Sequence, residues 1–367
     1  MSVDPLPGTD PVTRAAATGA AACDQSGAFP RAALAALRGL GLTARPPLAA
    51  ADAARLLHRL AAVGRGDLSV GRILEGHYNT LFLIDQYGDA TQRRRFQALA
   101  DDGALFGVWN TDQPGVPLGL IDGRLVGAKA FCTGVDGLAH AIVTVEGAQG
   151  REMLIVPLEA PAVDRRWWRP LGMRASGSHI VDFTGLAVQP DWRLGRAGDY
   201  VAQPWFSAGA MRFAAVQVGG AHGVLDIVLA HLTRTGRKDD PHQGHRLGEM
   251  ATAVETGYLW LGRCAESWSR AQGDEAAGAE AVATVNAARG AVEAAALRVL
   301  ELAERSVGAA GLIAPHPLER RLRDLRTYLR QPNPDGALAG VAQALSEGRW
   351  TPGAALAARA VEDGPAT

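Results

Sequence analysis

Hydrophobic positions follow a helical period over the first hundred residues of the chain. Leucines recur at positions 34, 37 and 40 and again at 56, 57 and 60, so each set lies on one helix face. Glycines and the Pro46-Pro47 pair separate these two segments. Further helices are expected around 72–86 and 91–100, with Gly88 between them. The pattern predicts an α-helical N-terminal domain over residues 1–103.

Short strand-like runs replace the helical period between residues 104 and 202. Each run is apolar and rich in β-branched or aromatic residues; the runs span 105–109, 125–131, 141–145, 153–157, 179–183 and 186–189. Turn pairs such as Asp122-Gly123 and Glu146-Gly147 punctuate them. Strands this short and frequent favour a small antiparallel barrel or sandwich over alternating βα units, so we expect a middle β domain over 104–202.

Long helical segments return from residue 203 onward. We expect helices over 208–234, 243–271, 275–307 and 317–330, and a frayed stretch over the last dozen residues. Helices of this length packed side by side are typical of a four-helix bundle. The chain is therefore predicted to be an α+β protein whose C-terminal domain, 203–367, is a helical bundle.

Composition narrows the class of protein further. The 37 Lys and Arg residues balance the 38 Asp and Glu residues, which argues against a nucleic-acid scaffold or a polybasic membrane anchor. Cys23, Cys132 and Cys264 lie far apart, so we expect neither a disulfide framework nor a metal site. The N-terminus lacks a secretory pattern, and glycines, His222 and Asp226 interrupt the most apolar stretch. We expect a cytoplasmic protein that does not span a membrane.

Several motifs, in order, make the chain resemble the acyl-CoA dehydrogenase superfamily over residues 28 to 330. They are Gly-His-Tyr-Asn at 76–79, Gly-Val-Trp-Asn-Thr-Asp at 107–112, Gly-Ala-Lys-Ala-Phe-Cys-Thr-Gly at 127–134, Gly-Met-Arg-Ala-Ser at 172–176 and the Arg-Asp segment at 317–326. The resemblance implies an N-terminal helical domain, a middle β-barrel or sandwich and a C-terminal four-helix bundle. It also implies an FAD cofactor, a small-molecule substrate that could be a CoA thioester, and a homodimer or homotetramer.

The same resemblance implies one set of flavin contacts in the middle domain. Trp109, Asn110 and Thr111 occupy the strand end that contacts the flavin in the family. Phe131 replaces the aromatic residue beside the isoalloxazine ring, and Thr133 supplies the hydroxyl near its N5 atom. The chemistry suits these roles, because a flat ring can stack on a ring system and a hydroxyl can both donate and accept. The alternative is an ordinary strand with a half-buried Phe and an edge Thr.

A second set is implied in the C-terminal domain. Arg212 matches an arginine near the acyl pocket, and Arg237 one that reaches the FAD pyrophosphate of the partner subunit. Arg305 replaces a glutamine of the family before a turn in which Gly308 and Gly311 let the backbone approach FAD. Solvated arginines at helix ends and a glycine-rich helix stop are the structural alternatives.

One departure from the family pattern concerns the catalytic base. The glutamate that removes the α-proton in the best-known dehydrogenases falls at Pro332, which carries no carboxylate. Glu249 and Glu255 are the first replacements to consider, although both look like helix-surface residues. The catalytic residue is therefore left unknown.

These observations lead to one main hypothesis and two alternatives. The main hypothesis is an FAD-dependent oxidoreductase that transfers hydride to flavin from an acyl thioester or a related substrate. The first alternative is an oxygen-using monooxygenase of the same fold, which works from reduced flavin and needs no α-proton base. The second is a non-catalytic flavoprotein subunit. The Gly-Gly-Ala-His-Gly run at 219–223 does not follow a strand, so we discount it as a dinucleotide motif.

Overall fold

The computed structural model describes residues 10–147, 149–271, 273–354 and 356, and its first part is helical. The helices are α1 (Pro11–Ala16), α2 (Ala20–Ser26), α3 (Arg31–Gly39), α4 (Ala53–Gly66), α5 (Leu68–Tyr87) and α6 (Ala90–Asp101). The four helices expected in this region correspond to α3 to α6. The short α1 and α2 were not predicted, because six or seven residues are too few to display a hydrophobic period.

Within the described residues, nine strands follow and form two sheets. They are β1 (Phe106–Trp109), β2 (Gly119–Ile121), β3 (Arg124–Val126), β4 (Ala128–Cys132), β5 (His140–Gly147), β6 (Gly150–Pro157), β7 (Ala162–Asp164), β8 (His179–Asp182) and β9 (Arg193–Leu194). The larger sheet has the order β3-β2-β5-β6-β9, with β1 also paired to β5, and the smaller sheet has the order β4-β8-β7.

The expectation of a purely antiparallel arrangement is wrong in two places, because β1 and β2 each pair with β5 in parallel. Strand β1 runs parallel to β5, with Phe106 opposite His140, because the chain crosses to the smaller sheet between them and then returns. The run at 186–189 is also not a strand. It makes an isolated bridge between Ala187 and Arg124 instead.

The C-terminal part is again helical. Its helices are α7 (Trp205–Ala208), α8 (Ala210–Arg234), α9 (Pro241–Arg270), α10 (Glu275–Val307), α11 (Pro317–Tyr328) and α12 (Pro334–Ser346). Helices α8 to α11 match the four expected segments, but α12 was missed. The expected helix over 317–330 does end before Pro332, but a further helix begins at Pro334, which occupies the first turn of α12, and Asn333 caps it by accepting from the Gly336 N–H.

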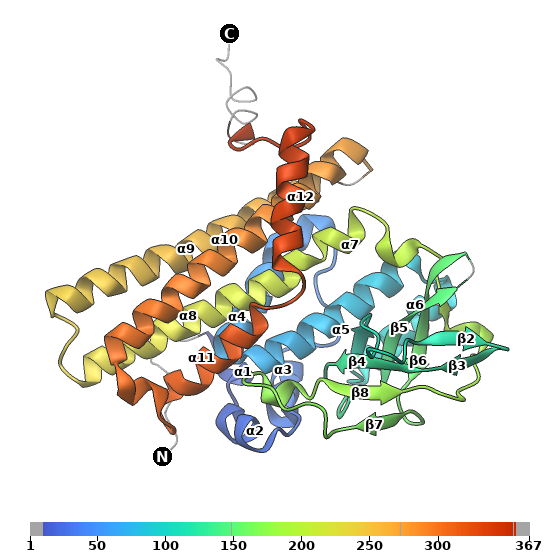
Figure 1. The fold of residues 1–367 in the computed structure, drawn as a ribbon, viewed down its shortest axis with the longest axis horizontal. Helices are drawn as coiled ribbons and strands as arrows, with labels where there is room; N and C mark the ends of the chain where they lie inside the picture. The colour runs from blue at the N-terminus through green and yellow to red at the C-terminus, as the bar shows by residue number, and fades with distance from the viewer. Residues whose placement is uncertain (1–9, 148, 272, 355, 357–367) are drawn as a thin grey trace, which may run out of the picture.

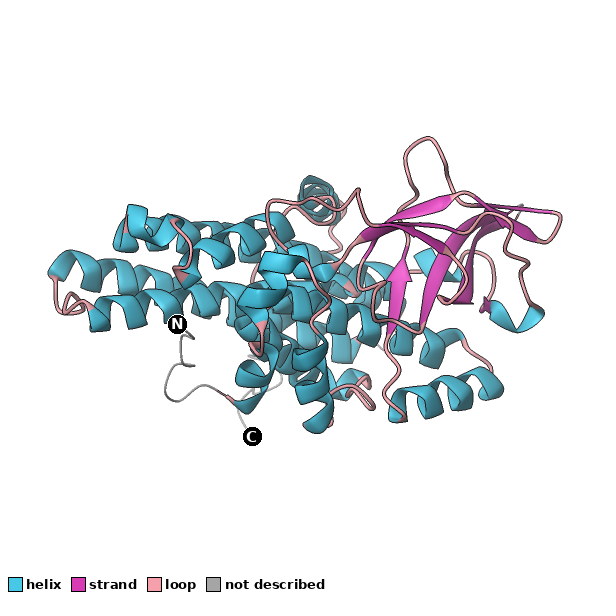
Figure 2. Cartoon of the chain, turned by 90° about the horizontal axis from the view of Figure 1, so that it is seen from below, coloured by secondary structure: helices cyan, strands magenta, loops and turns pink. Residues whose placement is uncertain are grey.

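Short 3₁₀ helices connect these elements. They are η1 (Ala50–Asp52), η2 (Arg174–Ser176), η3 (Pro190–Trp192), η4 (Asp199–Val201) and η5 (Ala309–Leu312). In space, the strands gather at one end of the molecule, and α8, α9 and α10 extend side by side away from them (Figures 1 and 2). This arrangement is the layered α+β fold expected from the sequence.

Helix α8 lies against α4 through glycines. A Cβ atom on Gly219 would lie 1.9 Å from the Ala61 carbonyl oxygen, and one on Gly64 would lie 2.2 Å from the Val216 carbonyl oxygen. Only glycine therefore allows this approach of the two backbones. The glycines at 219–223 serve helix packing.

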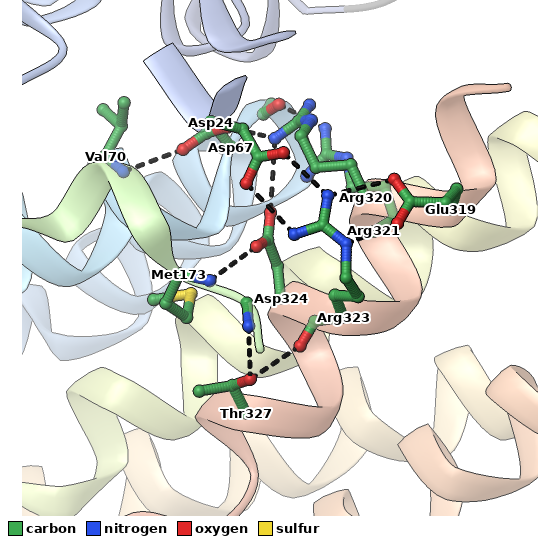
Figure 3. A network of polar contacts seen from close by, with 12 residues as sticks. Asp24, Asp67, Val70, Met173, Glu319, Arg320, Arg321, Arg323, Asp324 and Thr327 are labelled. Atoms are coloured by element: carbon green, nitrogen blue, oxygen red, sulfur yellow. Dashed lines mark hydrogen bonds and ion pairs between the residues drawn. The ribbon is translucent and has the colours of Figure 1, made fainter. Parts of the chain in front are cut away.

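The Arg-Asp segment ties α11 to the rest of the fold (Figure 3). Arg320 donates to Asp67, the N-cap residue of α5, at 2.5 Å, and lies 3.3 Å from Asp324. Asp324 accepts from the Met173 N–H at 2.6 Å, and this hydrogen bond joins α11 to the β region. Arg323 pairs with Asp24 on α2 at 2.7 Å. Three stretches of chain distant in sequence are thus joined at one buried cluster.

In the described part of the chain one helix, Trp205–Arg234, is long and apolar enough by length and composition to cross a membrane, and 61% of its most apolar window is buried inside the protein. The core helix of a soluble protein passes the same test, so this is weak evidence for a membrane span. Its neighbours α4, α5, α9, α10 and α11 pack around it.

Candidate functional site

A cavity of about 950 Å³ opens between the β region and the helical bundle. Its walls come from α5, from β1 and β4, from the start of α8, from α10 and from the end of α11. This volume lies within the range of roughly 300–1,000 Å³ that ligand pockets occupy. Trp109, Asn110, Thr111 and Phe131 all line it, so four of the expected flavin contacts do meet.

Phe131 is exposed to this cavity by an unusual backbone. Its φ of 56° lies in the left-handed region, and the register of β4 against β8 shifts between Lys129 and Cys132. A left-handed conformation is unfavourable for a bulky residue and marks positions worth functional attention. The bulge leaves Phe131 45% exposed between buried Ala130 and Cys132. Its ring lies nearly perpendicular to that of Trp167, at a centroid distance of 4.9 Å.

Trp109 and Asn110 are held in place by the β region. The Trp109 indole is buried and donates to the Thr133 carbonyl at 3.2 Å. The Asn110 side-chain oxygen accepts from Thr144 at 2.8 Å and from Arg151 at 3.0 Å. These contacts leave the end of β1 rigid where it borders the cavity.

Asp112, which follows this strand, has a structural partner. It accepts from the Lys129 ammonium group at 2.6 Å, and Lys129 is almost completely buried. Burial lowers the pKa of Lys129, and the hydrogen bond to Asp112 opposes that change. The lysine of the Gly-x-Lys motif is thus a buried ion-pair partner of Asp112, three residues after β1.

Thr133 is not among the residues that line the cavity. Its hydroxyl lies 2.9 Å from that of Ser178, which in turn lies 2.9 Å from that of Ser176. His179 contacts Asp136 at 3.2 Å. The role of Thr133 near a flavin stays a prediction.

The end of α11 brings Pro332 and Tyr328 to the same cavity. Pro332 lies at its wall, and its carbonyl accepts from the Arg289 guanidinium. The Tyr328 hydroxyl is fully buried and has no hydrogen-bond partner in the described part of the chain. Burial raises the pKa of Tyr328 well above its usual value, and the nearby Glu75 charge adds to the rise. This hydroxyl is therefore an uncharged hydrogen-bond donor with no acceptor among the described residues.

The two glutamates first considered as bases lie elsewhere. Glu249 pairs with Arg298 and His245 on the surface of the bundle, and Glu255 is exposed on α9. Among the described residues that line the cavity, Glu75 is the one carboxylate. It is buried on α5 and is engaged by Arg72 and by the Asn79 amide.

Sequence reasoning missed Glu75 and Tyr328. A charged residue inside the apolar stretch of α5 was a signal that could have identified Glu75, since a glutamate is rarely buried without a partner. Tyr328 carried no such signal, because a tyrosine at the end of a helix is ordinary. Arg212, expected near the substrate, does line the cavity.

The other residues expected at FAD lie at the opposite end of the bundle. There the end of α8, the start of α9 and the end of α10 come together, far from the strands (Figure 1). The Arg237 guanidinium lies 2.9 Å from the side-chain amide of Gln243, which also contacts Ser306 at 3.1 Å. Gly308 has a φ of 74° and ends α10, and Arg305 lies one turn before it.

These residues do not meet the first set within one chain. Arg305 pairs with Glu301, and Gly311 is buried against Val307 and Leu318. A site formed with a second copy of the chain would place the bundle end at another subunit's cofactor, as the resemblance implies. That arrangement stays a prediction.

The cavity suits a flat aromatic cofactor such as a flavin. Phe131 offers an exposed ring, and the buried Trp168 indole N–H beside it has no partner in the described part of the chain. A bound ring system with acceptor atoms would cover the first and satisfy the second. Thr111 and Asn110 would border it. No group of three or more His, Cys, Asp or Glu side chains among the described residues could hold a metal ion.

Comparisons with known proteins agree with this architecture. Residues 211–330 match the family "Acyl-CoA dehydrogenase, C-terminal domain". The protein named "Putative acyl-CoA dehydrogenase YdbM" from Bacillus subtilis (strain 168) is 25% identical over 223 residues, which are 58% of this chain and 57% of YdbM. The match thus spans little more than half the length of that relative.

Two solved structures share the fold over nearly their whole length. TdsC from Paenibacillus sp. A11-2, a dibenzothiophene monooxygenase solved with FMN and indole, superposes with a TM-score of 0.80 at 18% identity, over 93% of this chain and 96% of TdsC. Methanesulfinate monooxygenase MsuC from Pseudomonas fluorescens gives a TM-score of 0.79 at 18% identity, over 93% and 97%. The C-terminal helices thus match that domain family over residues 211–330, and the chain as a whole shares the fold of TdsC and MsuC.

Proposed function

We propose that this protein is a flavin-dependent monooxygenase that works from reduced flavin and molecular oxygen. The observation that carries the proposal is the absence of a free base from the described cavity wall. Among the described residues that line the cavity Glu75 is the one carboxylate, and it is already bound by Arg72 and Asn79, while the motif count places the dehydrogenase glutamate at Pro332. Removal of an α-proton needs a positioned, unengaged base, whereas oxygen transfer from a reduced flavin does not.

A bound reduced flavin would supply two electrons, so that one atom of oxygen enters the substrate and the other leaves as water. The chain's own residues would bind and orient the reactants. Phe131 would cover the ring system, and Thr111 and Asn110 would border it. Phe82, Trp205 and Phe213 give the remaining cavity an apolar wall that excludes water from the reacting atoms.

Tyr328 would act as a hydrogen-bond donor in this cavity. Its hydroxyl is buried, uncharged at neutral pH and without an acceptor in the described part of the chain. A donor of this kind can stabilise negative charge that develops on an oxygen atom.

Dehydrogenation of an acyl thioester is the second candidate. The match to YdbM favours it, since that protein is named as an acyl-CoA dehydrogenase. Glu75 would then be the base, and it would first have to leave Arg72. In either case we propose a cytoplasmic homo-oligomer in which Arg237 and Arg305 lie at a neighbouring subunit's cofactor.

The test compares two reactions on one flavin-loaded sample. The first mixes protein and a panel of acyl-CoAs without oxygen and follows bleaching of the flavin absorbance. The second supplies reduced flavin from a separate reductase, together with oxygen and an aromatic probe such as indole, and follows the product mass for a gain of one oxygen. Extraction and chromatography of the bound cofactor decide between FMN and FAD.

We expect product from the second reaction and no turnover in the first. Acyl-CoA turnover within the usual enzymatic range of about 1–10³ per second would refute the monooxygenase. In that case Glu75→Gln should abolish bleaching. A purified sample that retains no flavin after reconstitution would refute both candidates.

A further inference from the structure

The floor of the cavity is a chain of polar contacts between α5 and α8. One Glu75 oxygen binds Arg72, and the other accepts from the Asn79 amide nitrogen. The Asn79 oxygen in turn accepts from Nε of Arg212. A single carboxylate therefore serves two guanidinium groups, that of half-buried Arg72 and that of buried Arg212, and Arg212 reaches it only through the Asn79 amide.

Arg212 has hydrogen-bonding capacity that the described protein does not use. Its residue is 4% exposed, its guanidinium lies 4.7 Å from the centre of the Phe82 ring, and no described residue accepts from its two terminal nitrogens. Burial lowers the pKa of Arg212 to about 10, so the group is still protonated at neutral pH. A buried cation with unmade hydrogen bonds is costly unless a ligand supplies the acceptors.

The remaining arginines of the cavity wall differ from Arg212. Arg326 pairs with Glu304, and Arg330 pairs with Glu293. Arg289 donates to backbone carbonyls and covers the Phe213 ring at 5.2 Å, with no carboxylate at ion-pair distance among the described residues. The cavity therefore carries an excess of positive charge beside aromatic walls.

We propose that the substrate of this cavity carries an oxyanion, most simply a carboxylate on an apolar body, and that the terminal nitrogens of Arg212 bind it. A carboxylate fits the two parallel donors of a guanidinium. The aromatic wall formed by Phe82, Trp205 and Phe213 receives the apolar body. The inference rests on the proposed function in one respect, that both concern the same cavity. Binding of the carboxylate can be measured without any turnover.

The unused Tyr328 hydroxyl supports this inference independently. Tyr328 lines the same cavity, and its hydroxyl also lacks an acceptor in the described part of the chain. Donors that converge on one space without protein acceptors indicate a ligand rich in acceptor oxygens. The one other oxyanion that the proposed function brings to this cavity is a flavin phosphate, and the experiment below separates the two sources.

The test measures affinity rather than catalysis. Indole-2-carboxylate and neutral indole are titrated into the purified protein, with and without added FMN, by calorimetry and by tryptophan fluorescence, since Trp109, Trp168 and Trp205 line the cavity. A charge-assisted hydrogen bond corresponds to about a tenfold or greater gain in affinity. We expect the carboxylate to bind at least that much more tightly than indole.

Arg212→Gln should remove the preference for indole-2-carboxylate over indole. Arg212→Lys should keep part of it, because lysine keeps the positive charge but lacks the two parallel guanidinium donors. Arg326→Gln is the matched control, since Arg326 already has Glu304 and should leave the preference unchanged. If Arg212→Gln fails to fold, the two affinities of the wild-type protein and those of Arg212→Lys still test the inference. Equal affinities for the two probes would overturn the inference.

A parallel titration compares FMN with riboflavin, which lacks the phosphate. A loss of the FMN preference in Arg212→Gln, with the carboxylate preference intact, would assign the site to the flavin phosphate and overturn the inference. Failure to bind any flavin would refute the proposed function alone, because the carboxylate preference is measured without flavin as well.

Discussion

Asp67→Asn tests the buried cluster that fixes α11 against the rest of the protein. Asp67 has two separate tasks: one oxygen accepts from the Val70 N–H at 3.0 Å and caps α5, and the other binds Arg320 at 2.5 Å. Both side chains are largely buried, with 4% exposed for Asp67 and 16% for Arg320. Asparagine keeps an oxygen for the cap but removes the negative charge that faces Arg320.

The expected loss follows from these contacts. Removing one partner of a buried ion pair costs about 3–5 kcal/mol when the other charge is left alone. Arg320 keeps Asp324 at 3.3 Å, so we expect the smaller cost of a lost charge-assisted hydrogen bond, about 2 kcal/mol. Asp67→Ala also loses the cap and should cost about 1 kcal/mol more.

The same substitution should change how stability depends on pH. Burial raises the pKa of Asp324 to about 6, the Asp67 charge adds to the rise, and Arg320 opposes it. In the unfolded chain the pKa of an aspartate carboxyl group is about 3.9, so between about pH 4 and 6 the native state binds more protons than the unfolded state. The stability from Asp324 is therefore full below about pH 4 and is lost as the pH rises through about 6. Without the Asp67 charge this loss should be smaller.

Urea unfolding followed by circular dichroism gives the free energy of unfolding at each pH from 4 to 7. Asp52→Asn is the control, because Asp52 is 39% exposed and pairs with Arg55 at the surface. Such a change should stay within about 0.5 kcal/mol. If Asp67→Asn were as mild as Asp52→Asn, with an unchanged pH profile, the reasoning about the cluster would be refuted.

Two further predictions use matched pairs of positions. Gly219→Ala should lower the free energy of unfolding by several kcal/mol, because its Cβ would overlap the Ala61 carbonyl. Gly244→Ala, with open space around it, should instead raise the free energy of unfolding by up to about 1 kcal/mol. Equal effects of the two substitutions would contradict the close contact between α4 and α8. Tyr328→Phe should change the free energy of unfolding by no more than about 0.5 kcal/mol, because its hydroxyl has no partner among the described residues. Tyr78→Phe should cost about 1 kcal/mol, because Tyr78 donates to the Leu42 carbonyl. A large loss for Tyr328→Phe would show that its hydroxyl already has a partner.

The order and type of the main elements could be predicted from the sequence. Apolar residues repeat with the helical period in α3 and α8 to α11, and β-branched runs mark β5 and β6, because each of these elements is long enough to display its own pattern. Elements of six or seven residues, such as α1 and α2, cannot do so. The Pro332 to Pro334 stretch misled the prediction of α12 because a proline can begin a helix as well as end one.

The motifs located the cavity, but tertiary structure decided which residues serve it. Asn79 and Arg212 are 133 residues apart in sequence and meet in its floor, and Tyr328 reaches it from α11. The left-handed backbone of Phe131 comes from a register shift between two strands, which no local pattern reports. The Arg-Asp segment, the most specific motif, builds the cluster around Asp67. Local propensity fixes the type of an element, whereas burial and the pairing of charges depend on contacts between distant segments, which arise only when the chain is packed.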